Sequence, residues 1–569
     1  MKMDALFFAG MIVFLIVLFM GIEYINNRNF QKRMLKKLYQ GYGKGTGRKY
    51  KPEELLHICM YYQKHRADGQ IDDITWNDLH MDELYQRINT SLSAAGDEYL
   101  YYRLRTPVCD EAQMEKAEEQ IRFFMEHEEE RHKVQQVFYR LGRMRKFSIY
   151  EYLDHLDLLG ERKSGKYFLW DLAVLVSVGT MWFSVPVGTV LLLVVLCHNL
   201  MDYFKEYKEI EPYISSFRYI RRLLTGAEEM KQKDIAVFAK ERERLLECYR
   251  RLKGFLRSSY LVISSETGTG NPLEVVLDYL RMLFYFDLIQ FNKALSAVRG
   301  HMDEIDEMIT ILGRMETVVV AGEYRTSLGE GCCVPKLHYE EGAEISLRVE
   351  ELYHPFLENP VKNSLSVSRG VLLTGSNASG KSTFLRSVAT AALLSQTIHT
   401  CPASYYEAPF FRLFSSMSLR DDLSGGDSYY MVEIKSIKRI LDQVKRNGPP
   451  VLCFVDEVLR GTNTVERIAA STQIMKVLAA EGTLCFAATH DVELTGLLEK
   501  EYNNYHFEER IEENDIFFPY KLMEGPAASR NAIALLKMLG YDEKIIAEAE
   551  AMAERFLESG RWDQRSKTL

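Results

Sequence analysis

A glycine-rich segment in the second half of the chain has the residue types and spacing that hold phosphate groups. Residues 375–382 read GSNASGKS, which fits GxxxxGKS, and they lie between the apolar run VLLT and a helical pattern. In such a loop, backbone N–H groups and the N-terminus of the following helix bind phosphate oxygens. We expect Lys381 to reach the β- and γ-phosphates of ATP and Ser382 to bind Mg²⁺. The predicted nucleotide-binding residues are Gly375, Ser376, Asn377, Ala378, Ser379, Gly380, Lys381, Ser382 and Thr383.

Two later apolar runs, each typical of a buried strand, end in side chains that could act on a bound triphosphate. VLCFVDE ends at Asp456 and Glu457, and TLCFAATH ends at His490. Asp456 is predicted to hold the Mg²⁺ shell with Ser382, whereas Glu457 would activate the water that attacks the γ-phosphate. His490 would sense the γ-phosphate or polarise that water; a purely structural histidine is the alternative. The predicted catalytic residues are therefore Lys381, Glu457 and His490.

The segment DDLSGGDSYY, residues 421–430, predicts a second anion site. Its hydroxyl groups and glycines precede the helical pattern YYMVEIKSIKRIL, so they would lie at a helix N-terminus. Because the loop at 375–382 already supplies phosphate contacts for the chain's own nucleotide, this site is expected to face the ATP of another subunit in a symmetric homodimer. A plain glycine-rich turn is the alternative. The predicted trans contacts are Ser424, Gly425, Gly426 and Ser428.

Composition limits what surrounds these residues. The chain has 569 residues, of which 47% are hydrophobic and 27% charged, enough for three or four domains with full cores. The net charge of −9 gives no overall attraction to nucleic acid, so DNA contact would need a local basic patch. The 9 cysteines have no repeated spacing, which favours reduced thiols and predicts no structural metal.

The N-terminal region predicts attachment to a membrane. Ala5–Ile22 contains no charged residue over 18 positions, close to the roughly 20 that cross a bilayer as a helix. A cleaved signal peptide is the alternative, although the basic residues follow the apolar run rather than precede it. The basic run Arg28–Lys51 places this side in the cytoplasm by the positive-inside rule, and it is expected to contact anionic lipid. A solvated linker and a DNA tether are its other interpretations.

A second apolar region, residues 167–201, is longer than one membrane span requires. It splits near Ser184 into halves of about sixteen residues, each short for a span. One long tilted helix, a helical hairpin that enters and leaves on the same face, and a buried core helix remain open from this region alone.

Five segments together resemble the successive ATPase motifs of the MutS-type mismatch-repair family. They occur in the same order and at similar spacing, and they are TGSNASGKSTFLR, DDLSGGDSYYMVE, VDEVLRGTNT, FAATHDVEL and GPAASRNAIALLKMLGYDEKIIAEA. Residues 71–108 are also similar to the start of that family's helical core, and amphipathic patterns at 235–256 and 272–300 resemble its lever helices. The resemblance implies an α/β P-loop (ABC-type) ATPase domain plus a long-helix α-helical core and lever domain, here with transmembrane helices.

The family's architecture favours one interpretation of the second apolar region. In that family the two halves of the helical core pack together although another domain interrupts them in sequence. Here the interruption is apolar, so the chain would cross the membrane an even number of times, as a hairpin or a re-entrant pair. The predicted domains are an anchor at 1–27, a basic segment at 28–70, the first core half at 71–166, the hairpin at 167–201, lever helices and the second core half at 202–330, and the ATPase domain with a C-terminal dimerisation segment at 331–569.

The chain also departs from the family pattern. The first seventy residues leave no room for a mismatch-reading domain, and the clamp that would embrace DNA is missing or replaced, so direct mismatch reading is not expected. Asp427 stands where the family typically has arginine. Leu357 occupies a position where an aromatic ring often stacks on adenine, which makes Tyr520 a second candidate for that contact.

The expected function is that of a membrane-anchored, MutS-like ATPase, which hydrolyses ATP at composite sites of a dimer to move lever helices. Its expected location is the cell membrane, with the ATPase domain and helical core on the cytoplasmic side. The family implies DNA as a partner. The alternative is a nucleotide-gated membrane scaffold or partner-protein clamp that binds no DNA. Transport is disfavoured, because one anchor and a short hairpin offer too few helices to line a pathway.

Overall fold

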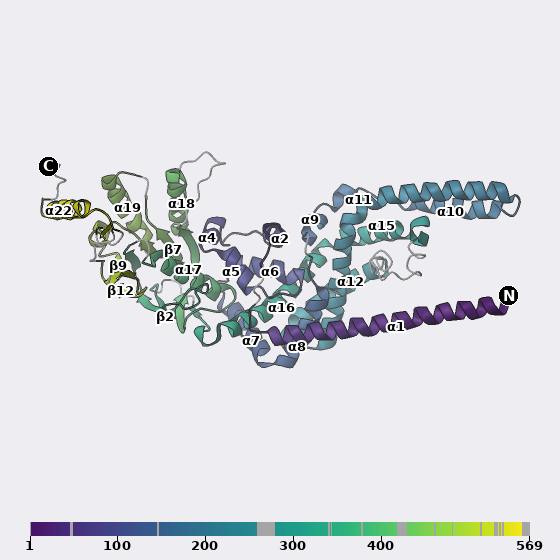
Figure 1. The fold of residues 1–569 in the computed structure, drawn as a ribbon, viewed down its shortest axis with the longest axis horizontal. Helices are drawn as coiled ribbons and strands as arrows, with labels where there is room; N and C mark the ends of the chain where they lie inside the picture. Colours follow the sequence, from purple (N-terminus) through teal and green to yellow (C-terminus); the bar gives the residue numbers. More distant parts are fainter. Residues whose placement is uncertain are drawn as a thin grey trace. The chain divides into compact units, whose positions relative to one another are not determined.

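The computed structural model describes residues 2–559 apart from several short segments. The described chain forms two compact units, each assembled from separate stretches of sequence (Figure 1). The helical unit comprises Met1–Asp68, Tyr85–Arg103 and Lys116–Ser327, and the α/β unit comprises Gly69–Leu84, Leu104–Glu115 and Leu328–Leu569. The segments outside the described residues are 46–48, 145–146, 259–278, 339–341, 343, 377–378, 418–428, 460–461, 481, 513–514, 528–532, 534–535 and 538–539.

Amphipathic helices build the helical unit. In α16 (Met302–Leu328), buried apolar residues recur at three- and four-residue spacing, as in Ile305, Met308 and Leu312. Helix α6 (Ala94–Arg105) approaches α16 so closely that a side chain at Gly313 would overlap Tyr99. Further helices are α1 (Lys2–Gly41), α2 (Pro52–Ile58), α3 (Met60–Lys64), α5 (Met81–Ile88), α7 (Glu111–Glu126), α8 (Glu128–Leu141), α9 (Ile149–Leu153), α12 (Ala239–Ser258) and α15 (Phe286–Arg299).

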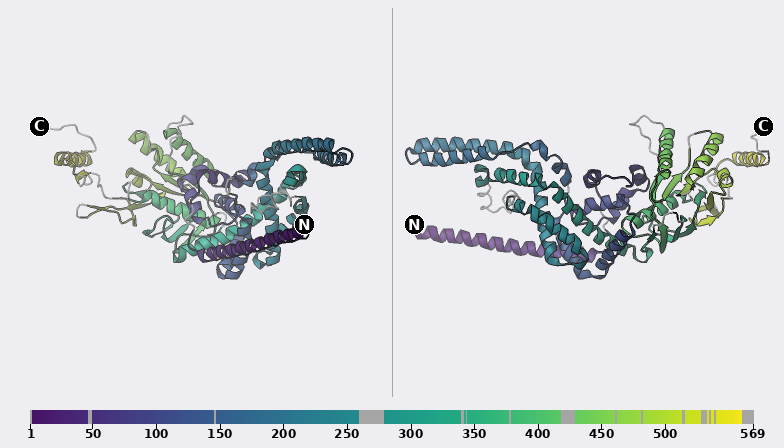
Figure 2. Two further views of the ribbon diagram at one scale, coloured as in Figure 1. Left: turned by 45° about the vertical axis from the view of Figure 1, so that its right-hand side comes forward. Right: turned by 180° about the vertical axis from the view of Figure 1, so that it is seen from behind.

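The second apolar region forms a hairpin of two helices, α10 (Gly165–Thr180) and α11 (Val185–Lys233) (Figures 1 and 2). The turn between them is compact, since a Cβ on Gly188 would lie 2.5 Å from Met181 Cγ. Trp182 and Phe183 in this turn are each 91% exposed. Helix α11 is both long and apolar enough to cross a membrane by length and composition, and most of its apolar part is exposed.

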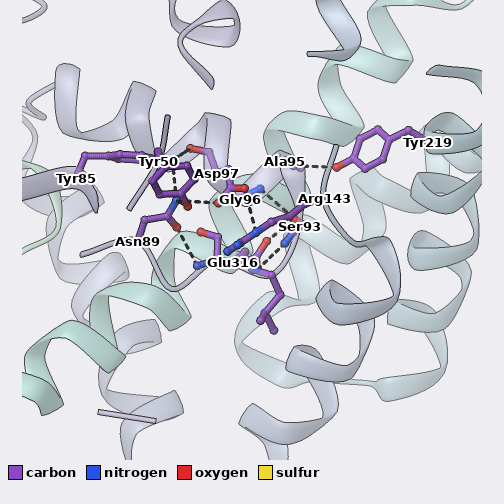
Figure 3. A network of polar contacts seen from close by, with 12 residues as sticks. Tyr50, Tyr85, Asn89, Ser93, Ala95, Gly96, Asp97, Arg143, Tyr219 and Glu316 are labelled. Atoms are coloured by element: carbon purple, nitrogen blue, oxygen red, sulfur yellow. Dashed lines mark hydrogen bonds and ion pairs between the residues drawn. The ribbon is translucent and has the colours of Figure 1, made fainter. Parts of the chain in front are cut away.

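A buried polar network joins segments that precede and follow this hairpin in sequence (Figure 3). Glu316 of α16 accepts hydrogen bonds from the hydroxyl and the N–H of Ser93. The Gly96 N–H donates to Ser93 Oγ at 3.0 Å, and the Ala95 N–H donates to the Tyr219 hydroxyl of α11 at 2.8 Å. A side chain at position 96 would overlap the Glu316 carboxylate. The glycine is therefore needed for α6 to begin against α16.

The main sheet of the α/β unit has six strands in the order β12-β9-β4-β8-β7-β6. Strands β4 (Gly370–Thr374), β7 (Val451–Asp456) and β8 (Thr483–Ala488) are buried throughout, as expected for parallel strands covered on both faces. Every pairing between β9, β4, β8, β7 and β6 is parallel, so the carboxyl ends of these strands share one edge. The remaining strands are β6 (Arg412–Ser416), β9 (Tyr502–Phe507) and β12 (Leu522–Glu524), which pairs antiparallel to β9.

Helices and two smaller sheets complete the α/β unit. The helices are α17 (Lys381–Thr397), α18 (Tyr429–Val444), α19 (Thr464–Leu478), α20 (Glu493–Leu497) and α22 (Glu543–Ser559). The smaller sheets are β1-β5-β2-β3, formed by Lys336–His338, Tyr405–Pro409, Leu347–Leu352 and Asn363–Val367, and the pair β10 (Arg510–Glu512) and β11 (Asp515–Phe517). The predicted combination of an α/β domain with a large helical part is confirmed.

A segment from far upstream belongs to this unit. Helix α4 (Asp73–Asp78) packs on β6, and its buried Asp78 accepts hydrogen bonds from Ser415 Oγ at 2.6 Å and from the Met417 N–H at 2.9 Å. Arg386 of α17 donates to the Asp78 carbonyl at 2.9 Å. Asp78 therefore links the end of β6 to the helix that follows the glycine-rich loop.

The Glu316→Gln variant tests the network of the helical unit. Burial raises the pKa of Glu316 to about 7, although hydrogen bonds from Ser93 and Leu92 to the carboxylate lower it. Because the folded-state pKa lies above the unfolded value, this group's contribution to stability is full at low pH and is lost as pH rises through about 7. The loss should reach about 2.5 kcal/mol between pH 5 and pH 8, and the variant should not show it.

Urea unfolding of the full-length protein at both pH values measures this difference. Glu119→Gln, on an exposed part of α7, is the matched control and should behave as the wild type. Equal pH dependence in the wild type and the Glu316→Gln variant would contradict the assignment.

Candidate functional site

The glycine-rich loop connects β4 to α17. Gly375 has φ of 137° and Gly380 has φ of 105°, a region that side-chain-bearing residues rarely adopt. A Cβ on Gly375 would lie 2.7 Å from the Phe507 carbonyl oxygen, and Gly380 is the N-cap of α17. Gly375 and Gly380 therefore lie in tight turns close to the N-terminus of a 17-residue helix, where the helix dipole favours an anion.

Lys381 places a positive charge inside this loop. Its side chain is almost fully buried, and Nζ donates to the carbonyl oxygens of Gly375 at 2.7 Å and Ser376 at 2.8 Å. Nζ also lies 3.5 Å from His490 Nε2. An ammonium group held by carbonyl dipoles in this way is well placed to bind phosphate oxygens.

Ser382 and Asp456 meet beside the lysine. Ser382 Oγ donates to Asp456 Oδ2 at 2.5 Å, which joins the first turn of α17 to the end of β7. Mg²⁺ prefers such oxygen ligands, usually one or two side chains together with substrate phosphates. In the described part of the chain there is no group of three or more His, Cys, Asp or Glu side chains that could hold a metal alone. The serine and aspartate thus fit a metal that arrives with a phosphate.

Glu457 and His490 face each other at the ends of β7 and β8. His490 Nε2 lies 2.9 Å from Glu457 Oε1, and the Glu457 N–H donates to the Ala488 carbonyl at 2.8 Å. Glu457 and Leu459 both have φ of 61°. Such left-handed conformations cost roughly 1–3 kcal/mol each and cluster at functional sites. The turn after β7 is therefore held in a strained form that aims the carboxylate at His490.

Two contacts, one buried and one partly buried, hold the segments that follow β7 and β8. Glu433 of α18 accepts a hydrogen bond from the Leu459 N–H, and Arg467 of α19 makes a two-pronged contact with Asp491 at 2.6 and 2.9 Å. Because Asp491 follows His490, the second contact fixes the histidine segment against α19. Sequence reasoning missed these residues and Asp78, since each is an ordinary polar residue in its own helix or loop.

A pocket of about 480 Å³ opens beside the loop. Gly380, Ser382 and Thr383 line it, and so do both adenine candidates, Leu357 and Tyr520. The Tyr520 ring lies against the loop, because a Cβ on Gly380 would be 3.0 Å from Tyr520 Cδ1. The pocket can therefore take the body of a nucleotide whose phosphates enter the loop.

Six of the predicted site residues lie in segments outside the described residues. They are Asn377, Ala378 and all four predicted trans contacts, Ser424, Gly425, Gly426 and Ser428. The other predicted site residues lie around the pocket and the carboxyl edge of the sheet. They are Gly375, Ser376, Ser379, Gly380, Lys381, Ser382, Thr383, Asp456, Glu457, His490, Leu357 and Tyr520.

A parallel sheet with a glycine-rich loop and a helix after one strand, and paired acids after another, is the arrangement that P-loop α/β proteins use to bind nucleotides. The MutS domain V family model matches residues 371–557, so this C-terminal region is similar to the corresponding domain of MutS-type proteins. The DNA mismatch repair protein MutS of Thermus thermophilus is 33% identical over 211 residues, which cover 36% of this chain and 26% of the relative. DNA mismatch repair protein MutS 2 of Haloarcula marismortui is 34% identical over 179 residues, covering 31% and 19%. The chain thus matches about a quarter or less of each relative's length.

The Tyr520→Ala variant tests the adenine contact. Removing a stacked aromatic ring costs about 1 kcal/mol, so the Kd for ATP should rise roughly five- to tenfold, and Leu357→Ala should have a smaller effect. Equilibrium binding of a fluorescent ATP analogue measures both. Tyr541→Ala, an exposed tyrosine that does not line the pocket, is the control. An unchanged Kd in Tyr520→Ala would remove Tyr520 from the base site.

Proposed function

We propose that the α/β unit hydrolyses ATP with the help of Mg²⁺. The observation that carries the proposal is the meeting of Lys381, the Ser382–Asp456 pair and the Glu457–His490 pair at the carboxyl edge of β4, β7 and β8. No other set of described residues combines a phosphate loop, metal-type oxygens and a base.

Each side chain would have a distinct role in this reaction. Lys381 and the loop N–H groups bind the β- and γ-phosphates. Ser382 and Asp456 would hold Mg²⁺, which supplies positive charge to the phosphate oxygens. Glu457 accepts a proton from the attacking water, and His490 keeps that carboxylate in position from the neighbouring strand. The strained turn after β7 fixes the direction of the Glu457 carboxylate before substrate arrives.

We also propose that α1 and the α10–α11 hairpin attach the protein to a membrane. Both belong to the helical unit and extend in the same direction in every view (Figures 1 and 2). The hairpin surface is apolar, whereas charged residues of its base pair with one another, including Lys166 with Glu206 at 2.5 Å. Helix α10 has 16 residues and is about 24 Å long, shorter than the roughly 30 Å hydrocarbon core. A hairpin that enters and returns on one face fits this length.

The proposed action of the ATPase cycle rests on the resemblance to MutS-type proteins. A homodimer that closes over two ATP molecules would move the helices of the helical unit. The named relatives are DNA mismatch repair proteins, and in this chain a groove of about 250 Å³ between α8 and α11 is lined by four arginines, Arg140, Arg218, Arg221 and Arg222. DNA binding that weakens steeply with salt would favour DNA as the partner; its absence would favour a protein clamp or scaffold.

The Glu457→Gln variant tests the hydrolysis proposal. The neutral amide cannot accept the proton of the attacking water, so turnover should fall at least a hundredfold while ATP binding persists. Phosphate release and retention of radiolabelled ATP on the full-length protein measure the two effects. Glu466→Gln, an exposed acid in the first turn of α19, should hydrolyse ATP normally. Undiminished turnover in Glu457→Gln would remove Glu457 as the base.

The fluorescence of Trp182 tests membrane insertion. In lipid bilayers brominated along the acyl chains, emission from this exposed tryptophan of the hairpin turn should be strongly quenched. The difference between the wild type and Trp182→Phe isolates its signal. Trp76, which is 1% exposed in the α/β unit, supplies the control through Trp76→Phe and should show no lipid quenching. Quenching of Trp182 by aqueous acrylamide alone would contradict insertion.

A further inference from the structure

A second cavity, of about 630 Å³, lies within the helical unit. It is lined by parts of α2, the beginning of α6 and the segment that follows α8. Its volume is in the range of pockets that hold small organic molecules. Tyr50, Tyr139 and Phe147 give it an aromatic lining, and the charged residues of the lining include Asp97, Glu98 and Arg143.

Glu98 is the unusual residue of this cavity. Its side chain is 95% buried, since only 5% of the residue is exposed. Ser148 Oγ donates to Glu98 Oε1 at 2.9 Å, whereas the buried Oε2 has no hydrogen-bond partner among the described residues. A buried carboxylate oxygen normally has a donor, and leaving one without costs about 1–3 kcal/mol or more for a charged group. The unsatisfied oxygen therefore points to a ligand that donates.

The nearby acids already have cationic or amide partners. Arg143 Nε lies 3.1 Å from Asp97 Oδ2, and Asn89 Nδ2 donates to Asp97 Oδ1 at 2.8 Å (Figure 3). His57 contacts Glu151. Glu98 is a third carboxylate beside these two pairs, and no ion pair to it is present among the described residues.

Burial destabilises the ionised form of Glu98 as long as no positive group lies beside it. Burial raises the pKa of Glu98 well above its ordinary value. Hydrogen bonds from Ser148 and from the Tyr61 backbone lower it, and the neighbouring Asp97 and Glu151 raise it further. Lys49 also lines the cavity, but its side chain is exposed. A positive group inside the cavity would stabilise the carboxylate form of Glu98.

We propose that this cavity binds a small organic cation, with its ammonium group against Glu98 and its apolar body against Tyr50, Tyr139 and Phe147. The aromatic walls favour an organic ligand, because ammonium groups are attracted to ring faces. A bare metal ion fits less well, since the described residues offer no group of three or more acidic, histidine or cysteine side chains. The site lies in the helical unit, so the proposal does not depend on nucleotide hydrolysis.

Binding should release a proton. A proton held by the Glu98 carboxyl group is displaced when the ammonium group binds, so that an ammonium ion and a carboxylic acid give an ammonium–carboxylate pair and one free proton; a Glu98 that is already ionised releases none. A neutral molecule of the same shape would release none. Proton release therefore distinguishes a site that recognises a positive charge from a site that any apolar molecule of this shape can fill.

The experiment compares benzylamine with benzyl alcohol on the full-length protein in detergent. These probes have the same shape, but only benzylamine is a cation at neutral pH. Isothermal titration calorimetry in two buffers of different ionisation enthalpy gives the affinity and the number of protons released. We expect saturable benzylamine binding with release of up to one proton, and at least tenfold weaker binding of benzyl alcohol.

The Glu98→Gln variant completes the test. The amide keeps the shape of the side chain and removes its charge, so benzylamine should bind at least tenfold more weakly and without proton release. Glu119→Gln, an exposed acid of α7, should bind as the wild type does. Equal benzylamine affinity in Glu98→Gln, equal affinity of the wild type for both probes, or no saturable binding of benzylamine would overturn the proposal. If Glu98→Gln fails to fold, the two-probe comparison and the proton count on the wild type still decide the outcome.

Discussion

The parallel pairing of β4, β8 and β7 is the constraint on which the nucleotide site depends. Parallel strands end at one edge of a sheet, and here that edge brings together Lys381, which follows the loop after β4, Glu457, which follows β7, and His490, which follows β8. The glycine-rich loop, the Ser382–Asp456 contact and the Glu457–His490 contact all lie at this edge. The apolar strands are buried on both faces, so the register that aligns these ends is set by the core.

The sequence predicted the part of this site that is encoded locally. Apolar runs of strand length that end in Asp456, Glu457 or His490 can be recognised without knowledge of the fold, and so can a glycine loop before a helix. The supporting residues could not be predicted in this way. Asp78 accepts a hydrogen bond from Ser415, more than three hundred positions away, and Glu433 of α18 accepts one from the Leu459 N–H in the turn after β7. Their roles arise from packing, which no local pattern reports.

The helical unit shows the same division between local and non-local information. The break in the apolar region near Ser184 could be expected from its proline and glycines, and α11 does begin at Val185. The polar network around Glu316 could not be expected, because Ser93, Tyr219 and Glu316 come from widely separated segments. The cavity beside Glu98 is also a product of assembly, since its aromatic walls come from residues almost a hundred positions apart.

The close contact between α6 and α16 has a consequence for how this protein can change over time. Gly96 and Gly313 are positions where even one added methyl group would collide with the facing helix. At position 96 a second substitution at Glu316 could remove the colliding atoms, whereas at position 313 the added methyl group would also meet the Ala95 carbonyl oxygen, which no substitution removes. We therefore expect these two glycines to limit the sequence drift of the helical unit more tightly than its larger buried residues, which neighbouring side chains can accommodate by repacking.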